Sequence, residues 1–263
     1  MLRLTVYISL AITAGVASFF ITDATLVNMT AGLSVGLLLP VVDEVARNWG
    51  NLRHLWYSLR YRNKSIRVST SYLFKIYVDG KYLLIRGSRY RSHFQPVGGV
   101  HKVSPQGKAT LSALGATDDD LVPLDPASYG DLRVRVPGKR IFQFFQWFDS
   151  RQGREDSPWR EFQEELIAAD ILPPGTFPHI MHNYLGREVD PIQYSPWAES
   201  LEILVADIYE LVPNQEQEDS LRQLAATGHP DIVWVSAQQI KRRGAVPGQP
   251  QTVDISTHSR RIL

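Results

Sequence analysis

The stretch that decides the fold is Trp159-Arg160-Glu161-Phe162-Gln163-Glu164-Glu165-Leu166. Ser157 is a candidate N-cap and Pro158 suits the first helical position, while Pro173-Pro174-Gly175 ends the segment. These signals predict a helix over residues 158–169. Its apolar side consists of Trp159, Phe162, Leu166 and Ala169.

The same helix carries three carboxylates. Glu161, Glu164 and Glu165 are spaced i, i+3, i+4, so we expect them to project from one side. Like charges at this spacing repel each other, and a divalent cation between them would turn the repulsion into attraction. Mg²⁺ or Mn²⁺ would accept such oxygens together with substrate phosphates. A glutamate face that is merely solvated is the alternative.

The surrounding residues predict a mixed sheet. Two β-rich runs, 72–78 and 81–86, flank Asp79-Gly80, which indicates a type I′ hairpin. Further strands are expected at 132–136, 178–185, 201–211 and 231–235, and the apolar run Ile141–Phe148 is expected as a core strand. Helices are expected at 216–226 and 237–242. Strands, then a helix, then strands predict an α+β domain.

The first 46 residues differ from the rest, because Leu4–Thr22 and Ala24–Val42 contain no charged residue. Each run would form about 28 Å of helix, close to the bilayer core. We therefore expect a transmembrane hairpin over 1–46, with helices at about 4–22 and 24–43. A basic juxtamembrane linker is expected over 47–69, and a cytoplasmic domain over 70–263. A cleaved signal peptide and a buried soluble hairpin are the alternatives.

Cations flank the hairpin and predict its orientation. Arg3 precedes the first run, the connection carries only Asp23, and six cations follow the second run: Arg47, Arg53, Arg60, Arg62, Lys64 and Arg67. The positive-inside rule then places both termini in the cytoplasm, as for a multi-pass inner-membrane protein. Trp49, Trp56 and Tyr57 fit an interfacial segment beside lipid headgroups, although a nucleic-acid patch is the rival interpretation.

Composition limits the chemistry. The chain has 263 residues, a formal net charge of +1 and no cysteine. Cysteine nucleophiles, zinc–thiolate sites and disulfides are excluded, and the charge argues against a protein that coats a DNA or RNA duplex.

The segment Arg160–Glu165 resembles the second half of the Nudix box, G-x5-E-x7-R-E-U-x-E-E-x-G-U with U apolar. Other Nudix-like features follow in order over roughly residues 70–243: the glycine pair in Gln95–Val100, the long strand Leu201–Ile208, and Ile232–Ser236 with Gln239-Ile240. The resemblance implies that Glu161, Glu164 and Glu165 bind metal and act in catalysis, and that Arg160 braces the loop.

Three departures leave catalysis open. About fifty residues, Val100–Ser150, separate the glycine pair from the box. The box's first glutamate would fall at Gln152, although Glu155 is nearby, and the late glycine is replaced by Ile167. No residue can be carried over as the general base.

The whole arrangement resembles the SMODS-associated NUDIX effectors with two transmembrane segments, which accompany CD-NTase enzymes in bacterial CBASS anti-phage systems. The matching features are the hairpin, the basic linker, Tyr82–Gly87, Phe94–Gly99 and Trp159–Leu166. The resemblance implies a homo-oligomeric effector that senses a cyclic oligonucleotide and disrupts the inner membrane in abortive infection. A membrane-tethered, Mg²⁺-dependent hydrolase of nucleoside diphosphate derivatives and an anchored scaffold without catalysis are the alternatives.

Basic and aromatic residues of the first strands are the expected ligand contacts. Cations could meet phosphates, and aromatic rings could stack on bases. The candidates are Arg86, Arg89, Arg91, Lys102, Tyr82 and Phe94. Ordinary surface arginines and core aromatics are the alternative.

Overall fold

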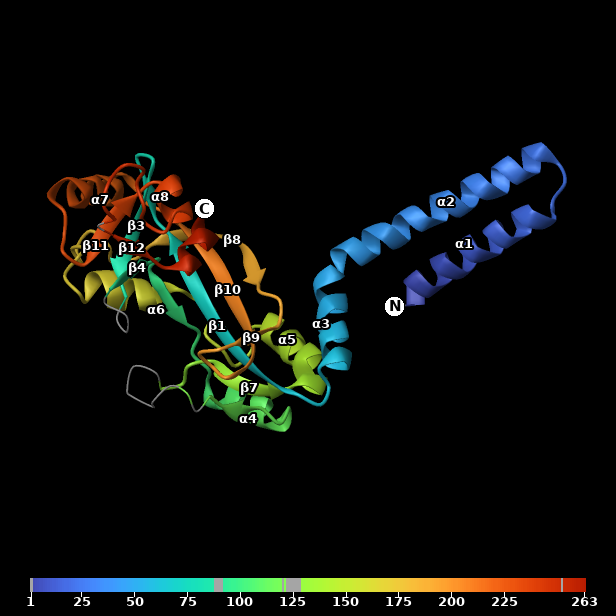
Figure 1. Ribbon diagram of the computed structural model, residues 1–263, viewed down its shortest axis with the longest axis horizontal. Helices are drawn as coiled ribbons and strands as arrows, with labels where there is room; N and C mark the ends of the chain where they lie inside the picture. The colour runs from blue at the N-terminus through green and yellow to red at the C-terminus, as the bar shows by residue number, and fades with distance from the viewer. Residues whose placement is uncertain (1, 88–91, 120, 122–128, 252) are drawn as a thin grey trace. The chain divides into compact units, whose positions relative to one another are not determined.

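The computed structural model describes residues 2–87, 92–119, 121, 129–251 and 253–263 (Figure 1). The chain divides into two compact units. One comprises Met1–Arg62 with Gly138–Phe145, and the other comprises Asn63–Pro137 with Gln146–Leu263.

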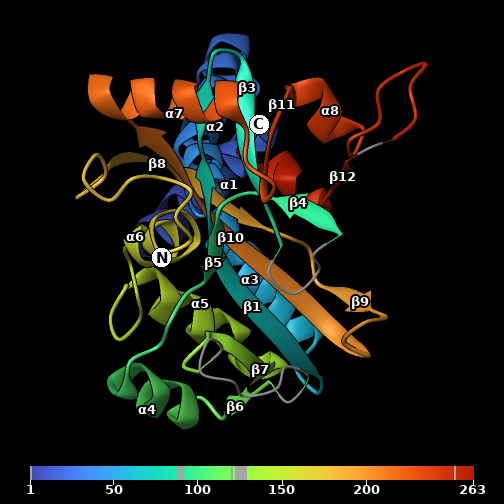
Figure 2. The ribbon, with the colours of Figure 1, turned by 90° about the vertical axis from the view of Figure 1, so that its left-hand side faces the viewer.

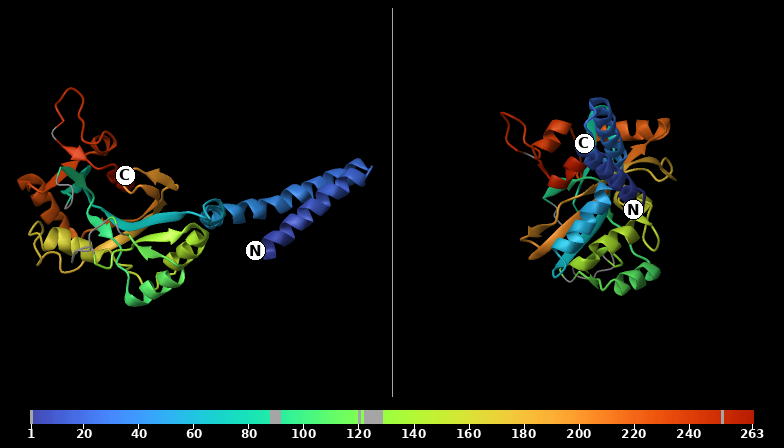
Figure 3. Two further views of the ribbon diagram at one scale, coloured as in Figure 1. Left: turned by 60° about the horizontal axis from the view of Figure 1, so that its bottom comes forward. Right: turned by 90° about the vertical axis from the view of Figure 1, so that its right-hand side faces the viewer.

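The first unit begins with two antiparallel helices, α1 (Leu2–Phe20) and α2 (Ala24–Arg47) (Figure 3). Asp23 caps α2, since its Oδ1 accepts hydrogen bonds from the backbone N–H groups of Thr25 and Leu26. Among the described residues, α2 is the one helix long and apolar enough to cross a membrane, whereas the apolar part of α1, Ile8–Phe20, is shorter. The finding supports one of the two predicted spans.

Apolar side chains on both helices face outward. Phe19 is 89% exposed and Leu39 is 67% exposed, which argues against a soluble core hairpin. The two helices meet through partly buried positions: Ala14, Gly15, Ala17 and Ser18 on α1, and Val27, Thr30, Ser34 and Leu37 on α2. The small residues Ala31, Gly32 and Gly36 of α2 are exposed and lie outside this contact.

Residues 47–69 contain ordered structure in addition to basic residues. Helix α3 (Trp49–Arg60) occupies most of this segment, and strand β1 begins at Ser65. His54 stacks on Phe145 with ring centroids 3.6 Å apart. Ser58 Oγ accepts a hydrogen bond from the Phe142 N–H at 2.8 Å. These contacts join α3 to residues 138–145 within the first unit.

Two sheets form the second unit. In the larger sheet the strand order is β6-β7-β1-β10-β8, with β5 paired to β1 and β9 to β10; in the smaller it is β11-β3-β4-β12, with β2 paired to β3. The strands are β1 (Ser65–Lys75), β2 (Tyr77–Val78), β3 (Lys81–Arg86), β4 (His93–Gln95), β5 (Gly98–Val100), β6 (Thr117–Asp118), β7 (Arg133–Pro137), β8 (Met181–Val189), β9 (Gln193–Ser195), β10 (Ser200–Val212), β11 (Ile232–Val235) and β12 (Asp254–Ile255).

The long strands β1 and β10 run parallel and side by side through this unit (Figure 2). Their outer neighbours β7 and β8 are antiparallel to them, so the sheet is mixed. The predicted α+β class with a Nudix-like mixed sheet is confirmed. The Asp79-Gly80 hairpin is also confirmed, because φ is positive at both residues, as a type I′ turn requires.

Strand alternation creates a hydrophobic core on each face of the sheets. On β1, Tyr72 and Phe74 enter the first core. Phe162 and Leu166 join them from the helical segment Trp159–Ile167, which we call the box helix. Leu73 enters the second core. On β3, Leu83 and Ile85 enter the first core, while Tyr82 and Leu84 enter the second. The box helix therefore covers one face of the strands.

The remaining helices correct one prediction. Ile141–Phe148 is not a strand but most of helix α5, because Ile141, Phe144, Phe145 and Phe148 recur at helical spacing and are buried. The helical segments that follow α3 are α4 (Pro105–Ala113), η1 (Gly138–Arg140), α5 (Ile141–Asp149), α6 (Trp159–Phe162), η2 (Gln163–Ile167), α7 (Gln215–Thr227), α8 (Ala237–Lys241) and η3 (Thr257–Ile262).

Candidate functional site

The glutamates lie where an α-helix changes to a π-helix. α6 begins at Trp159, with Pro158 in the N-cap position, one residue later than predicted. From Gln163 to Ile167 the chain is π-helical, and the Ala168 N–H donates to the Gln163 carbonyl at 2.8 Å. Such π-turns often occur at functional sites. Glu161 and Glu164 both contact Arg160 Nη1, and Glu165 contacts the Gly98 N–H.

A glycine pair on β5 brings the sheet against these carboxylates. The Gly98 N–H donates to Glu165 Oε2 at 2.8 Å. Gly98 has φ +150°, and a Cβ there would overlap the Tyr72 carbonyl. At Gly99 a Cβ would overlap the carboxylate of Glu161. Gly98 therefore needs glycine for β5 to pair this closely with β1, whereas a side chain at position 99 would require only the flexible end of Glu161 to move.

Arg160 holds the site together. Its guanidinium donates to the hydroxyl of Tyr72 at 3.2 Å and to the carbonyl of Val100 at 3.1 Å. Nη1 lies 2.7 Å from Glu161 Oε1 and 3.1 Å from Glu164 Oε2. The role of loop brace, which the Nudix resemblance implied for this residue, agrees with these contacts.

Glu155 is part of the same cluster. It accepts two hydrogen bonds from Arg160, at 3.0 and 3.1 Å, and one from the backbone N–H of Lys102 at 3.2 Å. Glu155 is therefore the acidic partner of Arg160 in the structure. By the strict spacing of the Nudix box, the first glutamate of the motif would instead fall at Gln152. The shortened spacing to Arg160 was the only sequence signal for this residue.

Burial and crowding change the ionisation of the carboxylates. Burial raises the pKa of Glu165 to about 8, and the charges of Glu161 and Glu164 add to this, against the opposing hydrogen bond from Gly98. Burial also raises the pKa of Glu161, against the charge of Arg160. Burial and the charge of Glu155 raise the pKa of Tyr72, so its phenol stays protonated at neutral pH.

The fit of a divalent metal can be judged from these contacts. Carboxylate oxygens are ligands of the kind that Mg²⁺ takes. In the described conformation, however, Arg160 lies between Glu161 and Glu164, and Glu165 is turned toward Gly98. Among the residues that the structure describes, no three His, Asp or Glu side chains lie together as a metal-binding group. The carboxylates match a metal in type but do not fit one in this arrangement.

The predicted ligand contacts lie in different places. Arg86 forms an ion pair with Asp231 at 3.1 Å and lies over the Phe94 ring. Tyr82 and Phe94 belong to the second core, and each is 9% exposed, so little of either ring is available to a base. Lys102 bonds Asp131 at 2.7 Å, near Glu155. Arg89 and Arg91 lie outside the described residues.

The sequence interpretation missed a buried polar cluster around Asp207 on β10. Arg187 Nε donates to its Oδ1 at 2.7 Å, and His101 Nε2 lies 3.4 Å from its Oδ2. Burial alone would raise the pKa of Asp207, but hydrogen bonds from His101 and Arg187 lower it well below its ordinary range. Arg154 and Arg187 both lie over the Phe148 ring. The available signal was one carboxylate, Asp207, within the apolar run Ile203–Tyr209 of this strand.

Comparisons with known proteins agree with the resemblance. Residues 65–263 match the family described as the SMODS-associated NUDIX domain. No curated protein matches the chain significantly. A solved structure of a NUDIX-family hydrolase from Clostridium perfringens is similar at 12% identity, with 76% of this chain and 93% of that chain covered. Its TM-score of 0.21 is too low to support an argument about the site.

Proposed function

The chain belongs to the family of SMODS-associated NUDIX domains, and from this premise we propose that it is a membrane-bound effector of a CBASS antiviral system. The observation that carries the proposal is that an apolar helix precedes the family domain in the sequence. An apolar helix long enough to cross a membrane, α2, ends at Arg47, and the family domain begins at residue 65. A domain of a CD-NTase-associated family is thereby joined to a membrane segment.

The contacts of Arg160 favour sensing of a ligand over its hydrolysis. Its guanidinium forms ion pairs with Glu155, Glu161 and Glu164, and the last two are among the three residues to which the Nudix resemblance assigns metal binding. A domain that binds a cyclic oligonucleotide needs a stable framework and does not need an available metal site. Arg160 supplies such a framework by connecting the box helix to β1 and β5.

At the membrane, the proposal assigns residues 1–46 to a two-helix hairpin in the inner membrane, with both termini cytoplasmic. Residues 47–64 form the juxtamembrane segment, and residues 65–263 form the sensing domain. Cyclic oligonucleotide binding favours a homo-oligomer whose hairpins together breach the bilayer. To shift such an equilibrium from 1:99 to 99:1, the ligand must bind the assembled state more tightly by about 5.5 kcal/mol.

Dye leakage from liposomes tests this proposal. Full-length protein should release dye when the cyclic oligonucleotide made by a cognate CD-NTase is added, and should be inactive without it. Removal of residues 1–46 should abolish leakage and phage protection but retain nucleotide binding. Protection by the truncated chain would show that membrane disruption is not the effector's action.

A membrane-tethered hydrolase of nucleoside diphosphate derivatives is the second candidate. One observation favours it: Glu165 has a raised pKa beside Glu161 and Glu164, and a cation would relieve their mutual repulsion. For these three residues to hold Mg²⁺ or Mn²⁺, Arg160 would have to leave Glu161 and Glu164, and Glu165 would have to turn away from Gly98.

Turnover assays separate the two candidates. The full-length protein should be assayed with Mg²⁺ or Mn²⁺ against dinucleotide polyphosphates, nucleotide sugars and NAD. If it is a hydrolase, the double change Glu164→Gln and Glu165→Gln should abolish turnover without unfolding the protein. Turnover that survives the double change would exclude these carboxylates as metal ligands.

A further inference from the structure

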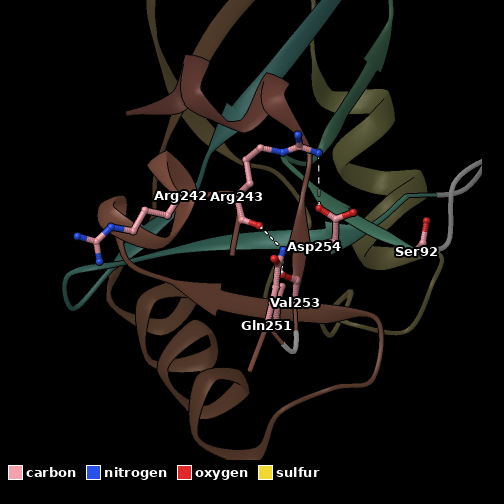
Figure 4. A pocket seen from close by; sticks show the side chains of 6 residues that line it. All are labelled: Ser92, Arg242, Arg243, Gln251, Val253 and Asp254. Atoms are coloured by element: carbon pink, nitrogen blue, oxygen red, sulfur yellow. Dashed lines mark hydrogen bonds and ion pairs between the residues drawn. The ribbon is translucent and has the colours of Figure 1, made fainter. Parts of the chain in front are cut away.

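An open pocket of about 690 Å³ lies at the C-terminal end of α8, beside β12 and the residue that precedes β4 (Figure 4). Its lining residues are Ser92, Arg242, Arg243, Gln251, Val253 and Asp254. Its volume is in the range of small-molecule sites, but it is open and mostly polar, which suits a charged group and not an apolar one. None of these residues belongs to the Nudix box, and none was predicted from the sequence to bind a ligand.

The pocket and the box helix are supported by different cores. Ile240 of α8 and Ile255 of β12 pack in the second core. Phe162 and Leu166 of the box helix pack in the first core. A ligand in the pocket would therefore not need to displace Arg160 from its glutamates.

Positive charge dominates the pocket and its margin. Arg242 and Arg243 are exposed, and Figure 4 shows their guanidinium groups extending to different sides. Arg260 approaches from η3, since its Nη2 donates to the Lys241 carbonyl at 2.7 Å. Asp254 is the single acid among the lining residues.

Asp254 has two ion-pair partners, Arg243 and His93. Its Oδ1 lies 3.8 Å from Arg243 Nη2, beyond hydrogen-bond distance, and its Oδ2 lies 3.0 Å from His93 Nδ1. Such a long contact leaves the Arg243 guanidinium only weakly engaged. An anion with closer oxygens can therefore compete with Asp254 for Arg243.

The backbone of Arg243 is fixed in an unusual conformation. Its φ is +56°, which costs energy for a residue other than glycine. Its carbonyl accepts a hydrogen bond from Gln251 Nε2 at 2.9 Å, and the same amide donates to the Val253 carbonyl at 3.1 Å. The loop thus holds the base of the Arg243 side chain at the edge of the pocket.

We propose that this pocket binds the phosphate groups of the nucleotide ligand, with Arg243 as its main cationic contact, Arg242 as a second cation at its margin and Ser92 as a hydroxyl donor. The proposal rests on the proposed function for the identity of the ligand as a soluble nucleotide. Lipid headgroups offer the same phosphate chemistry, so the experiment must separate the two sources.

Calorimetry with inorganic pyrophosphate tests the pocket on the full-length chain in detergent. The double change Arg242→Ala and Arg243→Asn should weaken binding about tenfold or more, because charge-assisted hydrogen bonds are lost. Asparagine tolerates the positive φ, which limits damage to the fold. Asp254→Asn should strengthen binding by roughly threefold, since it removes the competing anion. Arg222→Ala, an exposed arginine of α7 with its own acidic partners, is the matched control and should bind as the parent does.

Each outcome decides between the alternatives. If the double variant binds pyrophosphate as the parent does, the pocket assignment is overturned. If cyclic dinucleotides bind the parent and the double variant equally, the pocket assignment fails while the sensing function stands. If pyrophosphate binds through the arginines but cyclic oligonucleotides do not bind the parent, the pocket stands and the sensing function fails. Loss of pyrophosphate binding in phosphatidylglycerol nanodiscs, but not in phosphatidylcholine nanodiscs, would identify lipid as the ligand and overturn the nucleotide assignment.

Discussion

Arg160 connects four parts of the second unit through one side chain. It reaches Glu155 in the loop before the helix, Glu164 one helical turn later, Tyr72 on β1 and the Val100 carbonyl on β5. The side chain is only 25% exposed, so its ion pairs are less screened than surface pairs. Removal of Arg160 would leave several partly buried acceptors without a donor.

Arg160→Ala should therefore destabilise the domain by about 2–3 kcal/mol. For a chain of this size we expect the melting temperature to fall by roughly 5–10 °C. Thermal denaturation of the full-length protein in detergent checks this, with the exposed Arg222→Ala as control. Equal melting temperatures for the two variants would contradict the bracing role.

Glu165 makes stability depend on pH. Because burial raises its pKa to about 8, the folded state keeps this proton at pH values where the unfolded chain has lost it. The unfolded state then binds fewer protons between about pH 4.5 and pH 8, so stability falls as pH rises through this window. Below the window this contribution is fully present, and above it no further loss occurs.

Glu165→Gln should remove that dependence. The amide oxygen can still accept the Gly98 N–H, so at pH 5 the variant and the parent should be about equally stable. At pH 8.5 the variant should be more stable by roughly 1–3 kcal/mol. Melting curves across this range measure the difference, and Glu216→Gln, an exposed site on α7, is the control. Parallel pH profiles for parent and Glu165→Gln would refute the assignment.

At the scale of elements, β5 contacts β1 through Gly98 and the box helix through Gly99, and the two glycines have different constraints. Gly98→Ala meets a positive φ and the Tyr72 backbone, neither of which can yield, so we expect a loss of about 2–4 kcal/mol. Gly99→Ala meets only the flexible end of Glu161, which can swing away, so we expect a loss of about 1 kcal/mol or less. Urea unfolding compares the two variants directly. A larger loss at Gly99 would contradict this account of the contact.

Elements with local signals were predictable from the sequence. The Asp79-Gly80 turn requires positive φ at two residues, and this composition specifies it almost alone. Helix α5 was not recognised, because Ile141–Phe148 is apolar enough to suit a buried strand, and only the spacing of its buried residues identifies a helix. The π-turn had no local signal in the sequence, although its Leu166 is buried in the first core.

The candidate site was predicted only in part, because contacts between residues far apart in the sequence leave no local pattern. Arg160 and its three glutamates could be found because they are close in sequence and match a known pattern. Glu155 required the tertiary position of Arg160, and the Asp207 cluster required pairing of β10 with β8 and packing against His101. The Arg243 pocket depends on a parallel pairing of β12 with β4, two segments far apart along the chain.

At the scale of the whole molecule, the number of membrane spans determines where the N-terminus lies. Length and composition support α2 as a span, whereas the apolar part of α1 is shorter. Phe19 and Phe20 are nevertheless more than 80% exposed, as expected for side chains that face lipid. The cations after α2 favour a cytoplasmic domain in either arrangement.

Cysteine labelling distinguishes a two-span hairpin from a single span, and the natural chain contains no cysteine to interfere. In intact cells, a membrane-impermeant maleimide should label Thr22→Cys, which lies in the connection between α1 and α2. Gln249→Cys lies in the exposed loop after α8. It should react only after lysis if the domain lies in the cytoplasm, as the positive-inside rule predicts.

Leu2→Cys is the deciding position. If both helices span, the positive-inside rule keeps the N-terminus in the cytoplasm, and this cysteine should react only after lysis. If α2 alone spans, the N-terminal segment stays on the same side as Thr22, and Leu2→Cys should react in intact cells. We expect protection of Leu2→Cys, because the charge-free run Leu4–Thr22 is more stable inside the bilayer than in water. Labelling in intact cells would leave α2 as the single span and would require the effector to act without a hairpin.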